Sequence, residues 1–397
     1  MMTFLRTSSS ARGEYDMGIK GLSKNVIKQA WREGRLQDLH GEVVGVDAAG
    51  WVVKAVQANA RELCLEIDSR LHQAAFARML QATMHLLPAD ASLVLVLDGA
   101  PWPLKASTQT ARRSRRESAM VQAMEAEVAG DTATALKYFK RAVTAPAEFI
   151  SWIIAECSKQ PRVRCVVAPY EADAQLAWLE RAGEETVVYS AAEDSDFIVY
   201  GMRRVIYDVR ADGRFHEVRV MHDVLGHALG EFSFQGWTFE QFVVWSCACG
   251  CDYLDNIPRV GAVTVYRLVR DNLSLQVVAL IGLIANMAPN PREYQISLSN
   301  ACLSFRHHIV FKFTSRAGSS SLSNIACDHL TTLQEGEAFC VPLPMWSPDS
   351  CHGSLLTGQL EPITFAQRQI ARGVMCSVCC AMFHHNSEHN QLMIILM

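Results

Sequence analysis

SLVLVLDGAPWP, residues 92–103, is an apolar run rich in strand-forming residues that ends on Asp98 and passes into a Gly/Pro turn. A short run of this kind, bounded by turn residues, predicts a buried β-strand. GEVVGVDAAG at 41–50 has the same form and ends on Asp47. Two such strands, each finishing on an aspartate, indicate a sheet with acids along one edge.

Further strands and helices alternate along the chain. RVRCVVAPYEADAQLAWLERAG at 162–183 reads as a strand, a proline turn and a helix, ETVVYSAAEDSDFIVYG at 185–201 as a strand and an acidic loop, and VIYDV at 205–209 as another strand. Helical spacing predicts helices within 52–87, 111–157, 239–251 and 260–269. The alternation predicts an α/β fold with a mostly parallel sheet flanked by helices. After about residue 300 the pattern weakens, and SRAGSSSLSN at 315–324 is interpreted as a linker.

Six carboxylates follow the predicted strands, and strand carboxyl ends line one crevice of an open parallel sheet. They are Asp47, Asp98, Glu171, Asp173, Asp194 and Asp196. Any one of them could be a helix cap or a turn residue. Six together would repel one another unless cations neutralise them, and Mg²⁺ or Mn²⁺ prefers such oxygen ligands. Two such ions can activate a water and stabilise the leaving oxygen of a phosphodiester, so the pattern favours a metal site.

The spacing of these acids restricts how they could meet. Residues two apart do not share a helix face, so Glu171 and Asp173 reach one site only if Glu171 lies in the turn that Pro169 favours. Asp194 and Asp196 would point the same way in an extended loop. Asp252, in CGCDYLDNIP, is a seventh candidate, but locally it reads as a helix-end acid and nothing near it marks it as a ligand.

The charge of the chain is unevenly distributed. The net charge is −4, which excludes a uniformly basic nucleic-acid binder, yet residues 101–164 hold 11 Lys/Arg against six Asp/Glu. Residues 102–116 hold five basic residues and no acid, consistent with either a solvated helix face or a phosphate-binding patch. Lys105 and Arg112 are seven residues apart and can share a helix face, where they could stabilise developing negative charge or form a solvated pair.

Length and composition exclude several classes of protein. A length of 397 residues allows about two to three domains. Half of the residues are apolar, so the chain can bury a sizeable core. No apolar run is long enough for a membrane helix, and the first 16 residues lack the apolar core of a secretory signal. Thirteen cysteines favour a reducing compartment. Cys247, Cys249 and Cys251 are interpreted as small buried residues, and the Cys/His run at 375–390 as a disordered tail or a zinc site.

Six motifs carry a resemblance to a known family. They are MGIKGL at 17–22, VVGVDAAGW at 43–51, VLDGAPWPLK at 96–105, APYEADAQLAWL at 168–179, EDSDFIVYG at 193–201 and GCDYL at 250–254. Together, and in this order, they resemble the flap-endonuclease/XPG superfamily of structure-specific 5′ nucleases over about residues 17–310. Within it, the basic RRSRRE at 112–117 and the following helical segment lean towards the exonuclease 1 branch.

The resemblance implies a PIN-like nuclease core that holds two Mg²⁺ ions, replaceable by Mn²⁺. The matching metal-binding acids are Asp47, Asp98, Glu171, Asp173, Asp194, Asp196 and Asp252. Lys105 and Arg112 fall on the active-site lysine and arginine, with Arg113 the alternative if one residue is inserted. Expected DNA contacts are Gly18, Lys20, Arg113, Arg115, Arg116 and Gly261.

The resemblance also implies a division of the chain. Residues 17–115 and 151–310 would be two nuclease regions, 104–150 a helical arch that holds the 5′ strand, 250–272 a helix–two-turn–helix that grips the duplex, and 311–397 a weakly structured region. Residues 1–16 are polar and show no period, and they are interpreted either as a disordered extension or as the product of an upstream start codon, with Met17 as the alternative start. Three family features are altered: a stacking residue is replaced by Val53, one turn glycine is missing at 259–261, and Cys249 replaces the hydroxyl ligand of a K⁺ ion.

The expected function is a metal-dependent 5′→3′ exonuclease of double-stranded DNA with flap-endonuclease activity. It would act as a monomer in the nucleus, in mismatch repair and recombination, with mismatch-repair proteins as candidate partners and without a membrane. A replication flap endonuclease, a junction resolvase and a catalytically silent DNA-binding scaffold are the alternatives. Cleavage of a recessed end, a flap and a four-way junction would separate the enzymes, and tight DNA binding without cleavage would indicate the scaffold.

Overall fold

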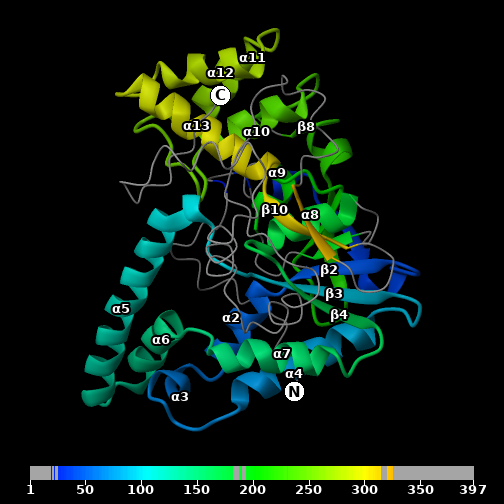
Figure 1. Cartoon of the computed structure of the whole chain (residues 1–397), viewed down its shortest axis with the longest axis vertical. Helices are drawn as coiled ribbons and strands as arrows, with labels where there is room; N and C mark the ends of the chain where they lie inside the picture. The colour runs from blue at the N-terminus through cyan, green and yellow to red at the C-terminus, as the bar shows by residue number, and fades with distance from the viewer. Residues whose placement is uncertain are drawn as a thin grey trace, which may run out of the picture.

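The computed structural model describes residues 19, 22, 26–181, 187–189, 194–229, 231–313 and 320–324. Its centre is a seven-stranded sheet with the order β1-β7-β6-β5-β2-β3-β4 (Figure 1). The strands of this sheet are β1 (Arg32–Arg35), β2 (Val43–Asp47), β3 (Ser92–Leu97), β4 (Val163–Val167), β5 (Val187–Tyr189), β6 (Arg204–Tyr207) and β7 (Arg214–Arg219). Two small hairpins pair β8 (Ala228–Leu229) with β9 (Phe232–Ser233) and β10 (Ile309–Phe313) with β11 (Ser320–Asn324).

Five neighbouring strands of the sheet, from β6 through β4, run parallel. The prediction of a mostly parallel α/β sheet is therefore confirmed. β7 and β1 extend it as an antiparallel edge, with Arg32 opposite Glu217. Sequence analysis did not predict β1, because REGR lacks the apolar run that identified the inner strands.

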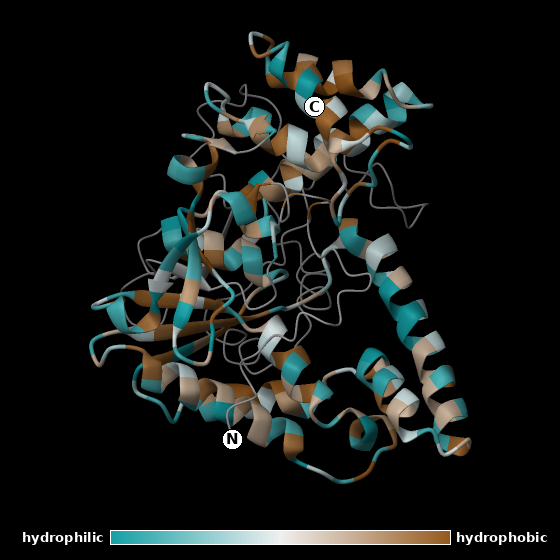
Figure 2. Ribbon diagram, turned by 180° about the vertical axis from the view of Figure 1, so that it is seen from behind, coloured by the Kyte–Doolittle hydropathy of each residue, from teal (hydrophilic) through white to brown (hydrophobic). Residues whose placement is uncertain are grey.

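Both faces of the parallel sheet are covered by helices, so its strands are buried on both sides. Along β3, Leu93, Leu95 and Leu97 face one hydrophobic cluster, while Val94 and Val96 face the other. The first cluster contains α2 (Ala49–Gln57), α4 (Leu71–Leu86) and α7 (Ala147–Cys157). The second contains α8 (Ala172–Arg181), α9 (Asp196–Val199) and α10 (Phe239–Ala248). Figure 2 shows brown, hydrophobic strands beside teal, hydrophilic ones: the inner strands β2 and β3 are apolar, whereas the edge strands β1 and β7 are rich in charged residues.

The remaining helices form two projections. On one side α5 (Ala106–Val128) packs against α6 (Thr132–Ala142) and α3 (Ala60–Cys64) through Ala123, Ala126, Ala135 and Phe139. On the other, α11 (Ala262–Arg270), α12 (Val277–Ala285) and α13 (Pro291–Arg306) continue from α10. Figure 1 shows α5 extending away from the sheet, beginning beside the edge where the parallel strands end. The short helical turns are η1 (Ile27–Gln29), η2 (Leu36–Asp38), η3 (Pro103–Lys105) and η4 (Val220–Val224).

The helical stretches are more divided than the sequence pattern predicts. Residues 52–87 form parts of three helices, and 111–157 forms α5, α6 and α7, with breaks at Gly130 and before Pro146. Gly130 has φ of 75°, and Asp131 accepts a hydrogen bond from the Thr134 amide, so the chain ends one helix and begins the next within a few residues.

Two local predictions are wrong. Asp194 and Asp196 do not lie in an extended loop, because the Asp194 carboxylate accepts the Asp196 amide at 3.0 Å and starts α9. Part of the predicted linker at 315–324 is strand β11, which pairs with β10. No described helix has the length and apolar character needed to cross a membrane. Residues 1–18, Lys20 and the Cys/His run at 375–390 lie outside the described residues.

Candidate active site

Acidic side chains gather where the parallel strands end. They are Asp47 at the end of β2, Asp98 directly after β3, Glu171 and Asp173 where β4 passes into α8, and Asp194 and Asp196 at the start of α9. Because β5, β2, β3 and β4 are parallel neighbours, their carboxyl ends lie at one edge of the sheet. The structure thus brings the six acids together, and Asp252 reaches the same place from the turn after α10.

Gly99 sets how closely the β3 and β4 ends approach. Its amide donates to the Tyr170 carbonyl at 2.7 Å, and the next amide, of Ala100, donates to Pro169 at 3.1 Å. A Cβ on Gly99 would lie 2.0 Å from the Ala168 carbonyl oxygen, so no larger residue fits without moving the backbone. This contact places Asp98 beside the first turn of α8.

Backbone amides fix the orientation of three acids. Asp47 Oδ1 accepts the Ala49 amide at 2.8 Å, and Asp98 Oδ1 accepts the Ala172 amide at 2.9 Å. Asp194 is held in the same way by the amide at the start of α9. Each of these contacts uses one carboxylate oxygen at the beginning of a helix, where negative charge is favoured.

Lys105 is the positive centre of the site. Its Nζ lies 2.7 Å from Glu171 Oε1 and 3.2 Å from Asp252 Oδ2. Arg112, two turns along α5, places its Nη2 2.9 Å from the same Asp252 oxygen. Arg113 instead points away and pairs with Glu117, so Arg112 is the α5 arginine that faces the acids. Thr108 also anchors α5 here by donating to the Asp252 carbonyl at 2.9 Å.

Three aromatic residues that sequence analysis did not identify surround Glu171. The Tyr253 hydroxyl donates to Glu171 Oε2, and the Tyr200 hydroxyl lies 3.1 Å from that oxygen and 2.8 Å from the Tyr253 hydroxyl. His308, fully buried and packed on Trp102, places Nε2 3.4 Å from the same oxygen. Only Tyr253 had a local signal, since it follows Asp252 in sequence; His308 is 137 positions from Glu171.

The acids at the two ends of the cluster differ in electrostatics. Burial raises the pKa of Asp47 to about 8, and the neighbouring Asp98 and Asp194 add to this rise. Burial and Asp194 also raise the pKa of Asp173 and of Asp196 well above the usual range. Around Glu171, burial acts in the same direction, but Lys105 and then His308 lower its pKa below the usual value.

These observations fit a divalent cation beside Asp47, Asp173 and Asp196. Asp196 is 1% exposed, and within the described residues its Oδ1 has no hydrogen-bond partner. A buried, unpaired carboxylate oxygen costs free energy, and burial together with repulsion among the acids disfavours their ionised forms unless a cation compensates. The donors are carboxylate oxygens from several elements, the ligand type that Mg²⁺ and Mn²⁺ prefer.

The raised pKa of Asp47 predicts a pH-dependent gain in stability for Asp47→Asn in metal-free protein. The folded state holds the proton up to about pH 8, whereas the unfolded chain releases it near 3.8. Ionisation therefore favours unfolding increasingly as pH rises between these values, and asparagine removes that effect while its Oδ1 still accepts the Ala49 amide. We expect the melting temperature of the variant in EDTA to exceed wild type, with a margin that grows from pH 5 to pH 8.

The control for this prediction is the same pair of melting curves with saturating Mg²⁺. A bound cation neutralises the cluster, so the margin should shrink or reverse. A margin that stays constant with pH in EDTA would show that Asp47 ionises normally in the folded protein.

The other predicted residues lie apart from the acids or outside the part of the chain that the structure describes. Arg115 and Arg116 are exposed on α5. Gly261 is the N-cap of α11, and a Cβ there would meet nothing within 4 Å. Val53 is half exposed on α2, and Cys249 is buried at the end of α10. Gly18 and Lys20 lie outside the described residues.

Two sequence-family models match the chain. The XPG N-terminal domain matches residues 17–119 and the XPG I-region matches residues 162–252. The chain belongs to the flap-endonuclease/XPG superfamily of nucleases. The first match contains Asp47, Asp98, Lys105 and Arg112, and the second contains the five remaining acids. Within this XPG chain, Tyr253 and His308 lie beyond both matched regions.

Curated relatives of this XPG chain carry exonuclease names. Exonuclease 1 of Drosophila melanogaster is 34% identical over 62% of this chain and 32% of its own length. Exodeoxyribonuclease 1 of Saccharomyces cerevisiae is 30% identical over 74% of this chain and 41% of its own. Among solved structures, "The catalytic core of Rad2 in complex with DNA substrate" aligns with a TM-score of 0.47 at 14% identity, covering 70% of this chain and 82% of that one. The chain thus spans about a third to two fifths of the length of these two curated relatives.

Proposed function

We propose that this chain is a metal-dependent 5′→3′ exonuclease of double-stranded DNA that also cleaves 5′ flaps. The observation that carries the proposal is the convergence of seven acids at one sheet edge around Lys105, beside the base of the basic helix α5. A cluster of acids this dense is unfavourable in a protein that only binds DNA, because it repels phosphate. It is the arrangement that two-metal phosphodiester hydrolysis requires.

Two Mg²⁺ ions, which Mn²⁺ could replace, would be held by the seven acids. These are Asp47, Asp98, Asp173, Asp194 and Asp196, with Glu171 and Asp252. Bound ions of this kind activate an attacking water and stabilise the leaving oxygen of a phosphodiester. The amide contacts to Asp47, Asp98 and Asp194 keep those carboxylates oriented before substrate arrives. We do not extend the proposal to K⁺, because Cys249 offers no hydroxyl oxygen.

Lys105 and Arg112 would act on the scissile phosphate. In the structure both cations are engaged by Glu171 and Asp252. When those acids are neutralised, the two side chains are available to a phosphate and stabilise the negative charge that develops during cleavage. The hydrogen bonds from Tyr200 and Tyr253 keep Glu171 in place during this exchange.

DNA would be held through its backbone at two surfaces. α5 and α6 would form the arch around the 5′ strand, with Arg113, Arg115 and Arg116 supplying phosphate contacts. At α11, the open space beside Gly261 would admit a duplex phosphate close to the helix N-terminus. Gly18 and Lys20 remain candidate contacts. Such binding is salt-sensitive and largely independent of sequence.

The proposed biological setting is nuclear DNA repair, including mismatch repair and recombination. The names of two relatives, "Exonuclease 1" and "DNA damage-inducible protein DIN7", support the DNA-processing part of this proposal. Mismatch-repair proteins are the proposed partners, and the active unit is proposed to be a monomer.

The test is cleavage of three substrates labelled at one end: a duplex with a recessed 5′ end, a 5′ flap and a four-way junction. Each is incubated with Mg²⁺ or with EDTA, using the whole chain and a protein that starts at Met17. We expect stepwise release of mononucleotides from the recessed end and incision of the flap, both lost in EDTA.

Each other outcome would replace the proposal with a specific alternative. Flap incision without release from the recessed end would indicate a replication-type flap endonuclease. Symmetric cutting of the four-way junction would indicate a resolvase. Tight binding of all three substrates without cleavage, in both proteins, would indicate a DNA-binding scaffold.

A further inference from the structure

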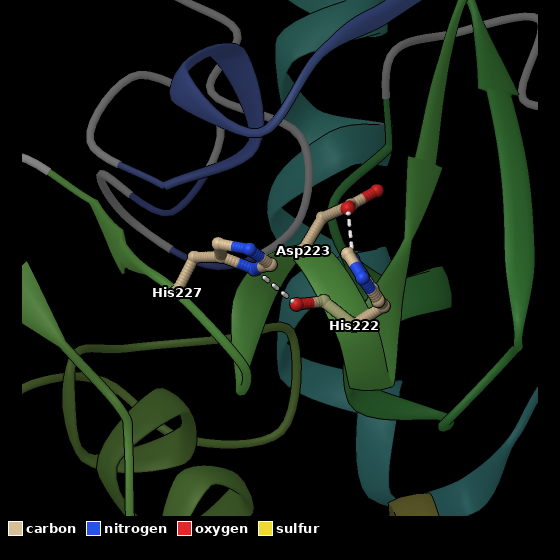
Figure 3. Close-up of side chains that lie close together, drawn as sticks. All are labelled: His222, Asp223 and His227. Carbon is tan, nitrogen blue, oxygen red and sulfur yellow. Dashed lines mark hydrogen bonds and ion pairs between the residues drawn. The ribbon is translucent and has the colours of Figure 1, made fainter.

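A second group of metal-ligating side chains lies outside the acid cluster, where β7 leaves the sheet. His222 and Asp223 belong to the π-helical turn η4, and His227 lies in the turn that leads to β8. One ligand atom from each of the three lies within 4.8 Å of the others. Figure 3 shows the two imidazole rings and the carboxylate close together, and the two histidines are exposed whereas Asp223 is buried.

The carboxylate of this group is already oriented. Asp223 is only 4% exposed, and its Oδ2 accepts the Arg219 amide at 2.8 Å. This contact leaves Oδ1 facing His222, whose Nδ1 lies 2.8 Å away. A backbone hydrogen bond that fixes one carboxylate oxygen and presents the other is typical of the outer contacts that orient metal ligands.

The third ligand is held in the tautomer that a metal needs. His227 Nδ1 lies 2.7 Å from the His222 carbonyl oxygen, to which it must donate a proton. Its Nε2 therefore carries the lone pair, as in histidine ligands that hydrogen-bond a carbonyl through the other nitrogen. The two rings lie 4.7 Å apart between centroids.

The guanidinium group of Arg32 places a positive charge between two of the three side chains. One guanidinium nitrogen, Nη2, contacts Asp223 Oδ1 and lies 2.9 Å from His222 Nδ1, so it bridges two of the three ligands. The Arg32 side chain is 45% exposed and can withdraw into water, whereas Asp223 is buried. A metal cation at this position would thus displace the exposed Arg32 side chain and keep the buried Asp223 carboxylate as its ligand.

We propose that His222, Asp223 and His227 form a Zn²⁺ site, at which Arg32 takes the place of the ion in the metal-free protein. Two imidazoles and one carboxylate are a ligand set that Zn²⁺ accepts, with a fourth position left to water. The site would tie η4 to the turn before β8. The competing explanation is that Arg32 and Asp223 form only a structural ion pair between β1 and η4.

The two explanations predict opposite effects of Arg32→Gln. As a competitor for the ion, Arg32 weakens Zn²⁺ binding, so its removal should tighten binding by about fivefold, the value of an ion pair worth about 1 kcal/mol. As a purely structural residue, its removal should leave Zn²⁺ binding unchanged or weaken it.

The experiment is calorimetric titration of the chelator-treated full chain with Zn²⁺, in excess Mg²⁺ to occupy the acid cluster. We expect His222→Ala and His227→Ala each to lose one equivalent of Zn²⁺ or to weaken it by at least about tenfold. His40→Ala is the matched control, because His40 is an exposed histidine 3.3 Å from Asp90. It should bind Zn²⁺ as wild type does.

Zinc bound at any other part of the chain is common to all the variants and cancels in the comparison. The Zn²⁺-induced rise in melting temperature, measured on the same proteins, should follow the titrations and confirms that each variant folds. Equal Zn²⁺ stoichiometry and affinity in wild type and both histidine variants would overturn the proposal. So would unchanged or weaker Zn²⁺ binding in Arg32→Gln.

Discussion

Asp194→Asn is expected to lower the rate of Mg²⁺-dependent cleavage by at least about a thousandfold, because a misplaced metal removes several kcal/mol of transition-state stabilisation. The substitution keeps Oδ1, which accepts the Asp196 amide, so the start of α9 should be preserved. What it removes is the negative charge. Single-turnover cleavage of the recessed duplex with saturating enzyme measures this effect on the chemical step.

Two further measurements separate a lost metal ligand from a damaged fold. In EDTA the variant should melt above wild type, because Asp194 contributes to the raised pKa values of Asp47, Asp173 and Asp196. The rise in melting temperature on adding Mg²⁺ should be smaller than in wild type, and DNA should bind as tightly or more tightly.

Asp90→Asn is the matched control for Asp194→Asn. Asp90 is an exposed acid that pairs with His40, so its variant should cleave and melt as wild type does apart from small shifts. Cleavage by Asp194→Asn within tenfold of wild type would contradict the assignment of Asp194 as a metal ligand.

Lys105→Met is expected to lower the single-turnover cleavage rate by about a hundredfold to a thousandfold, the range seen when one preorganised donor to a developing negative charge is lost. The affinity for the recessed duplex should change little, since Lys105 is buried among acids rather than placed on the binding surface. A loss in rate with nearly unchanged binding identifies an interaction made mainly in the transition state.

The same variant should have a distinctive stability. Burial disfavours the charge of Lys105, but Glu171, Asp252 and Asp196 raise its pKa, so it is the main cation that offsets the acid cluster. Methionine keeps the length of the side chain and removes this charge. We therefore expect a lower melting temperature in EDTA, recovered largely by Mg²⁺.

Arg112 and Arg113 provide an internal comparison for this prediction. Arg112 contacts Asp252, whereas the neighbouring Arg113 pairs with Glu117 on the outer side of α5. Arg112→Gln should slow cleavage clearly more than Arg113→Gln, which should act mainly on DNA binding and its salt dependence. Equal rate losses in the two variants, or wild-type cleavage by Lys105→Met, would contradict the proposed roles.

Much of the fold could be predicted because strands that are buried on both faces consist mainly of apolar residues, and such runs are visible in the sequence. β2, β3 and β4 are buried on both faces and therefore read as apolar runs, and the acids that end them are visible at once. β1 could not be found in the same way, since an edge strand with the sequence REGR has no apolar signature and is specified by its pairing with β7. Strand β11 was missed within the predicted linker for a similar reason, because its sequence has no apolar run and the strand is specified by its pairing with β10.

By itself the sequence determined the α/β class, the edge at which six acids meet and the presence of Lys105 and Arg112 near them. The fold class and the acidic edge follow from short-range patterns and from the fixed direction of parallel strands, whereas the placement of Lys105 and Arg112 follows from the motifs shared with the family. Only the tertiary structure decided that Arg112 rather than Arg113 faces the acids, that Tyr200, Tyr253 and His308 surround Glu171, and that Arg32 bridges His222 and Asp223. These contacts join residues far apart in the chain, and their geometry depends on helix rotation and side-chain packing, which no local pattern encodes.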